Sequence, residues 1–206
     1  MTEKDTDLLF TTERFTAFVD AVVAIAMTLL ILPLMESVSE STTQKLSTAE
    51  FLSENGGQLL SFGLSFALIA TFWLEHHRLY SRVHRISVPL LWLNIAWMLT
   101  IVWLPVATAM LGQMTTDPLQ AVVYIGTLIL TQVATLTARV YLIRHAGLSE
   151  WPRDDLRRGV AGDIAAIVLF LVAMALAAFV HSIGYLALLL VILTRPLARV
   201  LLQLRE

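Results

Sequence analysis

The sequence predicts an all-α integral membrane protein, and two observations carry that prediction. Hydrophobic residues make up 57% of the 206 positions and charged residues only 15%, and the mean hydropathy is +0.75, which is more apolar than a soluble domain of this length. The apolar residues also fall in runs of roughly 20, the length at which a helix crosses a hydrocarbon core about 30 Å thick. Because these runs lack period-2 alternation, and because open strands cannot satisfy their backbone groups in lipid, we expect helices.

Six such segments stand between polar breaks, and they define a single six-span membrane domain over residues 1–206. In chain order they cover about Phe15 to Met35, Gly57 to Tyr80, Val88 to Leu111, Leu119 to Ile143, Val160 to His181 and Ile183 to Leu202. Asp117 followed by Pro118 provides an N-cap and a proline at the first helical position, which sets the start of the fourth segment. Pro105 falls inside the third segment and is expected to kink it.

Basic residues gather on one side of the predicted bundle, and this asymmetry sets its orientation. They lie before the first segment, between the second and third, between the fourth and fifth, and after the sixth: Lys4, Arg14, Arg78, Arg82, Arg85, Arg139, Arg144, Arg153, Arg157, Arg158, Arg195, Arg199 and Arg205. The opposite side has Lys45 alone. Because positive charge is retained on the cytoplasmic side, both termini are predicted to be cytoplasmic.

Composition and motifs argue against several functional classes. A formal net charge of -2 provides no general basic surface for nucleic acid, and the absence of cysteine excludes disulfides and thiolate nucleophiles. No glycine-rich phosphate loop, Ser/His/Asp pattern or pair of coplanar carboxylates is present, so we expect neither an enzyme nor a cofactor. Adjacent histidines on a helix point about 100° apart, so His76 and His77 are not expected to form a structural metal site.

Asp20 is a carboxylate inside the first predicted membrane segment. A deep charge costs about 2.5 to 3.5 kcal/mol on insertion scales, so this side chain needs a partner or a wet position. Its own helix offers no partner, and the candidates at the same depth on other helices are Trp73, His76, His77 and Asn94. A purely structural tether between helices remains an open interpretation of Asp20.

The face of the first helix opposite Asp20 carries no charge. At 100° per residue, a stripe lies about 140° to 180° around the axis from Asp20, and it consists of Phe18, Ile25, Leu29 and Leu32. Thr28 lies beside it. If copies of this helix surrounded an axis, the last three stripe residues would form apolar rings and Thr28 a ring of oxygens, and such rings gate by dewetting. The alternative, that these are ordinary lipid-facing or core residues, stays open.

Two motifs in the first half of the chain resemble the prokaryotic members of the transmembrane protein 175 family of potassium channels. That family's first helix carries Arg-x-x-x-Phe-Ser-Asp, which appears here as Arg14, Phe18, Val19 and Asp20, with valine in place of the serine. The second motif consists of Trp73, His76 or His77, Asn94 and the pair Leu104-Pro105. The resemblance covers roughly residues 10 to 112, and the later segments match in length and hydropathy only.

The resemblance implies a homotetramer in the lipid bilayer, with the first helices lining a central ion path. It implies an apolar constriction at Ile25, Leu29 and Leu32, a hydroxyl layer at Thr28, and K+ passing near Ile25 and Thr28. It also implies a network that braces the pore helix: Arg14, Phe18, Asp20, Trp73, His77 and Asn94. Animal members carry two such repeats and reside in endolysosomes, so a single repeat favours a multi-pass protein of a prokaryotic plasma membrane.

The expected function is passive, potassium-selective conduction through this constriction. The Thr-Val-Gly-Tyr-Gly carbonyl filter is absent, so only a modest preference for potassium is expected. One alternative is a proton-coupled secondary transporter or proton pathway in which Asp20 and His77 titrate. Another is a protein without transport activity whose polar residues only hold the helices together.

Overall fold

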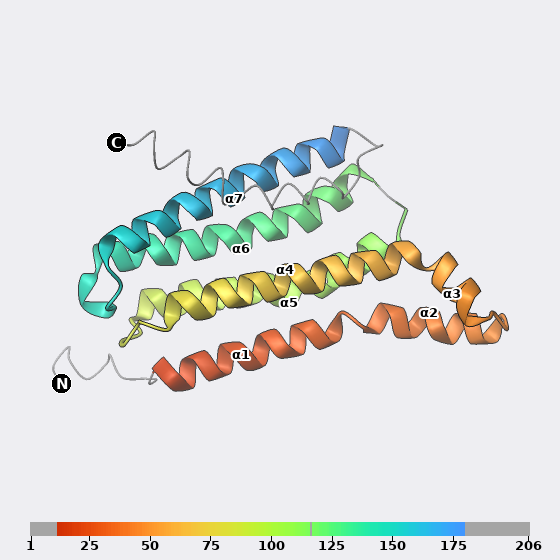
Figure 1. The fold of residues 1–206 in the computed structure, drawn as a ribbon, viewed down its shortest axis with the longest axis horizontal. Helices are drawn as coiled ribbons and strands as arrows, with labels where there is room; N and C mark the ends of the chain where they lie inside the picture. The colour runs from red at the N-terminus through yellow and green to blue at the C-terminus, as the bar shows by residue number, and fades with distance from the viewer. Residues whose placement is uncertain (1–11, 116, 180–206) are drawn as a thin grey trace.

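The computed structural model describes residues 12–115 and 117–179 as helices packed along one long axis (Figure 1). The elements are α1 (Thr12–Leu29), α2 (Leu32–Thr43), α3 (Thr48–Glu54), α4 (Gly56–Tyr80), α5 (Val88–Gln113), α6 (Pro118–Arg144), the 3-10 turn η1 (Ala146–Leu148) and α7 (Arg153–Phe179). Within these described ranges, extended pairing is limited to one isolated bridge between Val83 and Ser149. The all-α prediction is therefore confirmed for this part of the chain, and the sixth predicted segment, residues 183–202, lies outside it.

Five stretches of the described chain are long and apolar enough to cross a membrane: Thr12–Thr43, Gly56–Tyr80, Val88–Gln113, Pro118–Arg144 and Arg153–Ala177. They coincide with the first five predicted segments. The expected N-cap of α6 is confirmed, because the Asp117 carboxylate accepts a hydrogen bond from the Gln120 backbone N–H at 2.7 Å. The fifth segment begins earlier than predicted, at Arg153, because a charged first turn precedes its apolar part.

The prediction of one continuous first helix from Phe15 to Met35 is wrong. The helix stops at Leu29 and a second helix begins at Leu32. Pro33 explains the break: it has no N–H to donate to the Leu29 carbonyl, and its ring crowds that carbonyl. A proline is tolerated in the first turn of a helix, so a new helix begins around it. Leu32 therefore lies on a different helix from Ile25. Pro105, by contrast, lies inside α5 without ending it.

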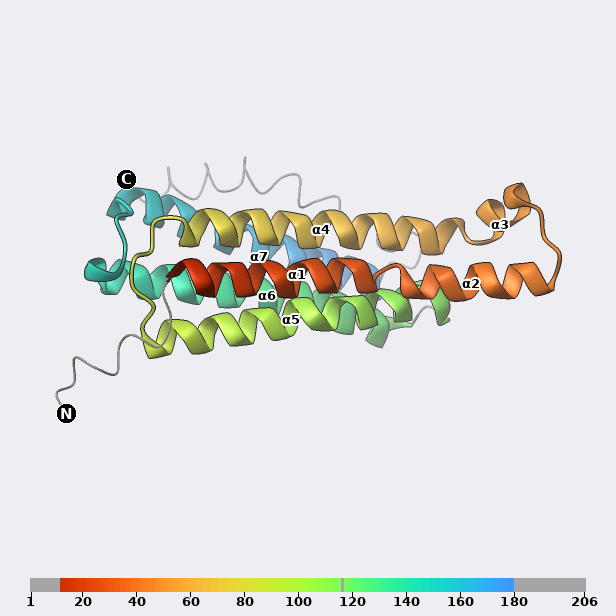
Figure 2. The same ribbon diagram turned by 90° about the horizontal axis from the view of Figure 1, so that it is seen from below.

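The helices form three layers, with α1 on one side, α4 and α5 in the middle, and α6 and α7 on the other side (Figures 1 and 2). Figure 2 shows α1 lying along the seam between α4 and α5. Both middle helices contact α1, and α6 packs against α5 and α7. The position of α1 at the edge of the layers leaves one side of it uncovered by the described chain.

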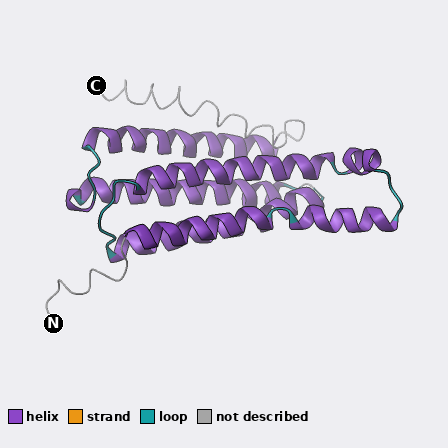
Figure 3. Cartoon of the chain, turned by 60° about the horizontal axis from the view of Figure 1, so that its bottom comes forward, coloured by secondary structure: helices purple, strands orange, loops and turns teal. Residues whose placement is uncertain are grey.

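α2 and α3 extend beyond the layers at one end of the bundle (Figure 3). Ser37 of α2 donates a hydrogen bond to the Gln58 side-chain oxygen at 2.8 Å, which ties α2 to α4. α3 begins with a capping box in which the Ser47 and Glu50 side chains and backbone N–H groups pair reciprocally. The hydrogen bonds from the Ser47 side chain and backbone lower the pKa of Glu50, because they stabilise the carboxylate form.

Hydroxyl groups connect the middle layer to α6. Thr108 of α5 donates to Ser65 of α4, and Ser65 and Tyr124 of α6 share a further hydrogen bond, both at 2.8 Å. Thr131 of α6 donates to Thr100 of α5 at 2.9 Å. Such small hydroxyl residues let membrane helices approach closely and satisfy one another.

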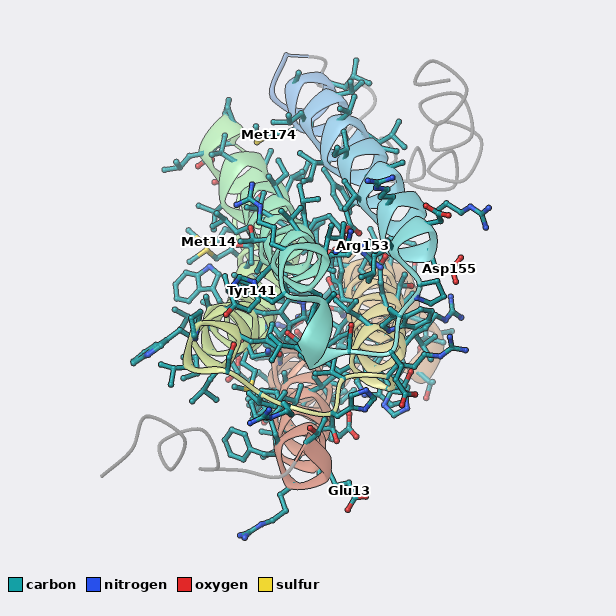
Figure 4. All side chains as sticks on the ribbon, turned by 90° about the vertical axis from the view of Figure 1, so that its left-hand side faces the viewer. Glu13, Met114, Tyr141, Arg153, Asp155 and Met174 are labelled. Atoms are coloured by element: carbon teal, nitrogen blue, oxygen red, sulfur yellow. The ribbon has the colours of Figure 1, made fainter. Side chains whose placement is uncertain are left out.

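One end of the bundle, which we call the arginine-rich end, holds most of the basic residues of the described chain: Arg14, Arg78, Arg82, Arg85, Arg144, Arg153, Arg157 and Arg158. Figure 4 looks onto this end, with Arg153 and Asp155 labelled at the start of α7. Its two loops are hydrogen-bonded to each other, since His84 N–H donates to Leu148 and Glu150 N–H donates to Arg82. These loops hold α4–α5 and α6–α7 in register.

A buried charge cluster joins α4, α6 and α7 near this end. Asp163 is fully buried and accepts hydrogen bonds from Arg139 Nε at 2.7 Å and Gln132 Nε2 at 2.9 Å. Arg139 Nη2 also reaches Glu75 of α4 at 3.4 Å. The guanidinium lies so close to α7 that a Cβ at Gly159 would be only 2.2 Å from Arg139 Nη1. A side chain at position 159 would therefore require Arg139 to shift away from its present position.

We expect Gly159→Ala to destabilise the protein by about 3 kcal/mol, because the added methyl group displaces Arg139 and leaves Asp163 as a buried carboxylate without its cation. The matched control is Gly162→Ala on the same helix, where a Cβ would meet nothing within 4 Å. That change should stabilise the protein by at most about 1 kcal/mol, because alanine favours the helix more than glycine does. Denaturant unfolding of the purified protein in detergent measures both, and equal effects at the two glycines would contradict this account.

Candidate pore-lining helix and its anchoring network

The two faces of α1 have opposite environments. One face packs into the chain's own core through Phe15, Val19, Val23 and Ala26, and Leu30 just after the helix continues this contact; each is at most 3% exposed. Val19 stands where the Arg-x-x-x-Phe-Ser-Asp motif has serine, and it is completely buried among apolar neighbours. Because valine has no hydroxyl, this buried position needs no hydrogen-bond partner.

The opposite face of α1 is apolar and uncovered by the described chain. Phe18 is 58% exposed, Ile25 60% and Leu29 38%, and Leu32 at the start of α2 is also exposed. Thr28 lies on the same face and donates its hydroxyl hydrogen to the Ile25 carbonyl at 2.7 Å. That bond uses the only hydrogen of the hydroxyl, so its oxygen lone pairs remain available as acceptors on the exposed side. This face therefore offers a hydrogen-bond acceptor beside its apolar side chains.

Asp20 has the interhelical partner that its position requires. Trp73 of α4 donates its indole Nε1–H to the Asp20 carboxylate at 2.8 Å. The Trp73 ring in turn packs against the His77 ring at a centroid distance of 5.8 Å, and His77 is exposed. The Asp20–Trp73 bond and the buried face of α1 together orient this helix about its axis, and so determine which side chains it presents outward.

A second network lies behind this contact and is fully buried. His76 Nε2 and Asn94 Oδ1 are 2.6 Å apart, and the Asn94 amide donates to the Tyr80 hydroxyl and to the Leu90 carbonyl. Because Asn94 Oδ1 can only accept, His76 must carry a proton on Nε2. The His76 ring stacks on Tyr80 at 4.4 Å and lies 4.3 Å from Trp97.

Phe15 of α1 packs against Tyr80 at a ring-centroid distance of 6.3 Å. The buried network therefore supports the base of α1, while Asp20 and Trp73 hold it higher up. Together they connect α1, α4 and α5 through hydrogen bonds and ring contacts between particular side chains, in addition to general apolar packing.

The structure brings together only some of the residues predicted to brace α1. Asp20 contacts Trp73 directly, whereas Asn94 pairs with His76 rather than with His77. Phe18 and Arg14 lie on exposed parts of α1, so within one chain they are not part of the buried network. Their bracing role stays a prediction about the assembled protein.

Tyr80 is the member of the network that sequence reasoning missed. A signal was present, since Tyr80 follows His76 by four residues and so lies on the same helix face. The same spacing argument separates His76 from His77, whose side chains point about 100° apart. In the described ranges no group of three or more His, Asp or Glu side chains is arranged to hold a metal ion.

Five membrane-length helices packed in layers define a polytopic membrane protein. The family model described as the endosomal/lysosomal potassium channel TMEM175 matches residues 14–105. A potassium channel of Chamaesiphon minutus is 30% identical over 142 residues, which are 68% of this chain and 68% of that relative. The chain belongs to the TMEM175 family of ion channels.

Two further relatives are named for the conduction of different ions. A potassium channel of Streptomyces collinus is 31% identical over 100 residues, 48% of this chain and 47% of the relative. The Bos taurus endosomal/lysosomal proton channel TMEM175 is 34% identical over 113 residues, 52% of this chain but 23% of the relative. The family therefore includes proteins named for potassium and for proton conduction.

The fold is also that of a solved family structure. The crystal structure of a lysosomal potassium-selective channel TMEM175 homolog from Chamaesiphon minutus superposes with a TM-score of 0.65 at 24% identity, covering 92% of this chain and 93% of that chain. The predicted family and membrane location are confirmed, and the bacterial relatives agree with a plasma membrane. The neighbours are ion channels, so the protein is not an enzyme.

We expect Trp73→Phe to destabilise the protein by about 1.5 kcal/mol, because it keeps an aromatic ring but removes the N–H that satisfies the Asp20 carboxylate. Trp92→Phe is the control, since Trp92 is 65% exposed and its change should stay within about 0.5 kcal/mol. The midpoint of thermal unfolding in detergent measures both. A Trp73 variant as stable as the Trp92 variant would mean that the bond does not anchor α1.

Proposed function

We propose that this chain assembles as a homotetramer in which the exposed face of α1 surrounds a central path for passive conduction of K+. The observation that carries the proposal is the division of α1 into an anchored face and an uncovered apolar face that also holds the oxygen of Thr28. The potassium-channel names of the bacterial relatives support the choice of ion.

The proposed constriction consists of stacked apolar rings from Ile25 and Leu29, with Leu32 beyond the helix break. Apolar rings hinder ion passage because they do not hold water around the ion. Thr28 oxygens, one from each subunit, would offset part of the lost hydration as K+ passes Ile25. Because potassium sheds water more readily than sodium, such a bottleneck favours potassium, though less strongly than a carbonyl filter. No cofactor is required.

The wider arrangement completes the proposal. We assign the arginine-rich end to the cytoplasm because positive charge is retained on that side. With an even number of spans, both termini would face the cytoplasm and residues 1–206 would form one membrane domain. The predicted sixth span, residues 183–202, lies outside the described residues. The Asp20–Trp73 bond keeps the exposed face of α1 directed at the ion path, since a rotation by one residue, about 100°, would bring another face there.

Ile25→Asn should raise potassium flux about tenfold, equivalent to a barrier lowered by about 1.4 kcal/mol, or weaken selectivity, because a polar ring holds water in the constriction. The measurement is flux from liposomes containing the purified protein, with a potassium and a sodium gradient compared. Ile95→Asn is the control, because Ile95 is an exposed isoleucine on α5, 39% exposed. If both rate and selectivity stayed unchanged at Ile25, α1 would not line the path.

Thr28→Val should bring the potassium and sodium fluxes closer together, because valine matches threonine in shape but lacks the oxygen that faces the ion. The ratio of the two fluxes in the same liposome assay measures the change. Thr71→Val serves as control, since Thr71 is likewise an exposed threonine whose hydroxyl bonds its own helix, at 2.8 Å. A ratio that falls equally in both variants would remove Thr28 from the selectivity mechanism.

A proton pathway is the second candidate function, and one arrangement favours it. Where α1 meets α4, Asp20 is hydrogen-bonded to Trp73, and the Trp73 ring packs against His77. The bovine relative is named a proton channel. Flux that requires a proton gradient and disappears in Asp20→Asn would support this function. Potassium flux that persists without a proton gradient would favour passive potassium conduction.

A further inference from the structure

A cavity of about 240 Å³ lies between α4, α6 and α7 at the arginine-rich end, away from the exposed face of α1. Its walls include the guanidinium groups of Arg78 and Arg139, the carboxylates of Glu75 and Asp155, and the ring of Trp151. Neither the proposed ion path nor the network that anchors α1 uses these side chains. The cavity therefore has chemistry of its own to be explained.

Two hydrogen-bond donors in the cavity have no acceptor among the described residues. Arg139 uses Nε and Nη2 on Asp163 and Glu75, but its Nη1 has no such bond and lies against Gly159. Arg78 is exposed, and its guanidinium makes no ion pair within the described ranges. An arginine carries donors only, so a molecule that satisfies both groups must offer acceptors.

The acids of the cluster are already opposed by cations. Glu75 and Asp163 both face Arg139, and Asp155 faces Arg158 at 3.5 Å. Arg82 adds a further charge, with its guanidinium 4.4 Å from the centre of the Trp151 ring. Among the residues that line the cavity, two guanidinium groups (Arg78 and Arg139) stand beside two carboxylates (Glu75 and Asp155). Because Asp155 is paired with Arg158 outside the lining, Arg78 has no carboxylate of the cavity as its partner and is left to face an anionic group such as a phosphodiester.

The apolar part of the lining indicates how such a phosphate is carried. Leu79, Leu156 and the Trp151 ring form this part, and the Trp151 indole N–H donates to the Leu79 carbonyl at 2.8 Å. Tryptophan is typical of the level of lipid headgroups in membrane proteins. Basic pockets between membrane helices at this level bind anionic headgroups.

We propose that this cavity binds the phosphodiester headgroup of an anionic membrane lipid, with its phosphate oxygens accepting hydrogen bonds from Arg78 and from Arg139 Nη1. The acyl chains extend toward the apolar surface of the helices. A bound lipid would connect α4 with α6 and α7 at the end where their loops meet.

The test is native mass spectrometry of the delipidated full-length protein in detergent, titrated with phosphatidylglycerol and, separately, with phosphatidylcholine. We expect phosphatidylglycerol to bind more tightly, and Arg78→Ala to weaken it about fivefold, the factor equivalent to about 1 kcal/mol for one arginine near an anionic headgroup. Arg157→Ala is the matched control, because Arg157 is an exposed arginine of the same end that pairs with Asp154 and does not line the cavity. It should bind as the unaltered protein does.

A second variant tests the charge argument in the opposite direction. Glu75→Gln keeps an acceptor for Arg139 but removes a negative charge from the cavity wall, so it should strengthen phosphatidylglycerol binding. Equal losses in Arg78→Ala and Arg157→Ala, equal binding of the two lipids, or weaker binding in Glu75→Gln would each overturn the proposal. Inorganic phosphate that displaces phosphatidylglycerol at equal concentration would assign the site to a free anion instead and overturn the lipid.

Discussion

The arrangement of this protein depends on one constraint: a polar side chain within the membrane-spanning part of the helices must find its partner on another helix. Asp20 meets Trp73, and Asp163 meets Arg139. Each pair joins a different set of helices, so that α1 is held on α4, and α4 is held to α6 and α7. Apolar surface alone would not select these neighbours, because lipid tails are as apolar as the helices themselves. The polar contacts therefore determine which faces turn inward and which remain outward.

The position of α1 connects this constraint with the proposed function. Its inner face is closed by Val19 and its neighbours, and its rotation is set by Asp20. From Phe18 to Leu29, what remains outward is a surface without charge. It is interrupted at Pro33, near which α1 ends and α2 begins. A helix anchored in this way can present the same side chains to an ion path in every copy of the chain. Anchoring one face of α1 to the rest of the chain thus determines which face stays exposed.

The two halves of the chain relate differently to the family. Residues 14–105, which the family model matches, contain α1, α4 and most of α5, together with the network that anchors α1. The buried ion pair of Arg139 and Asp163, and most of the cavity at the arginine-rich end, lie beyond that segment. The fold nevertheless extends over nearly the whole chain, as the superposition on the solved family structure shows. The later helices keep the architecture while using polar contacts of their own.

The sequence by itself determined the membrane class, five of the described helices and the family, because hydropathy and helix length act locally and can be read along the chain. It did not determine partners. His76 rather than His77 bonds Asn94, and Tyr80 joins them, because neighbouring side chains differ by about 100° in direction and only packing decides which one faces inward. Asp163 carried the same signal as Asp20, a carboxylate inside a predicted membrane segment, but neither its partner Arg139 nor the need for glycine at position 159 followed from that signal. The importance of Asp163 and Gly159 arises only where α7 brings them against Arg139, and that meeting is a property of the tertiary structure.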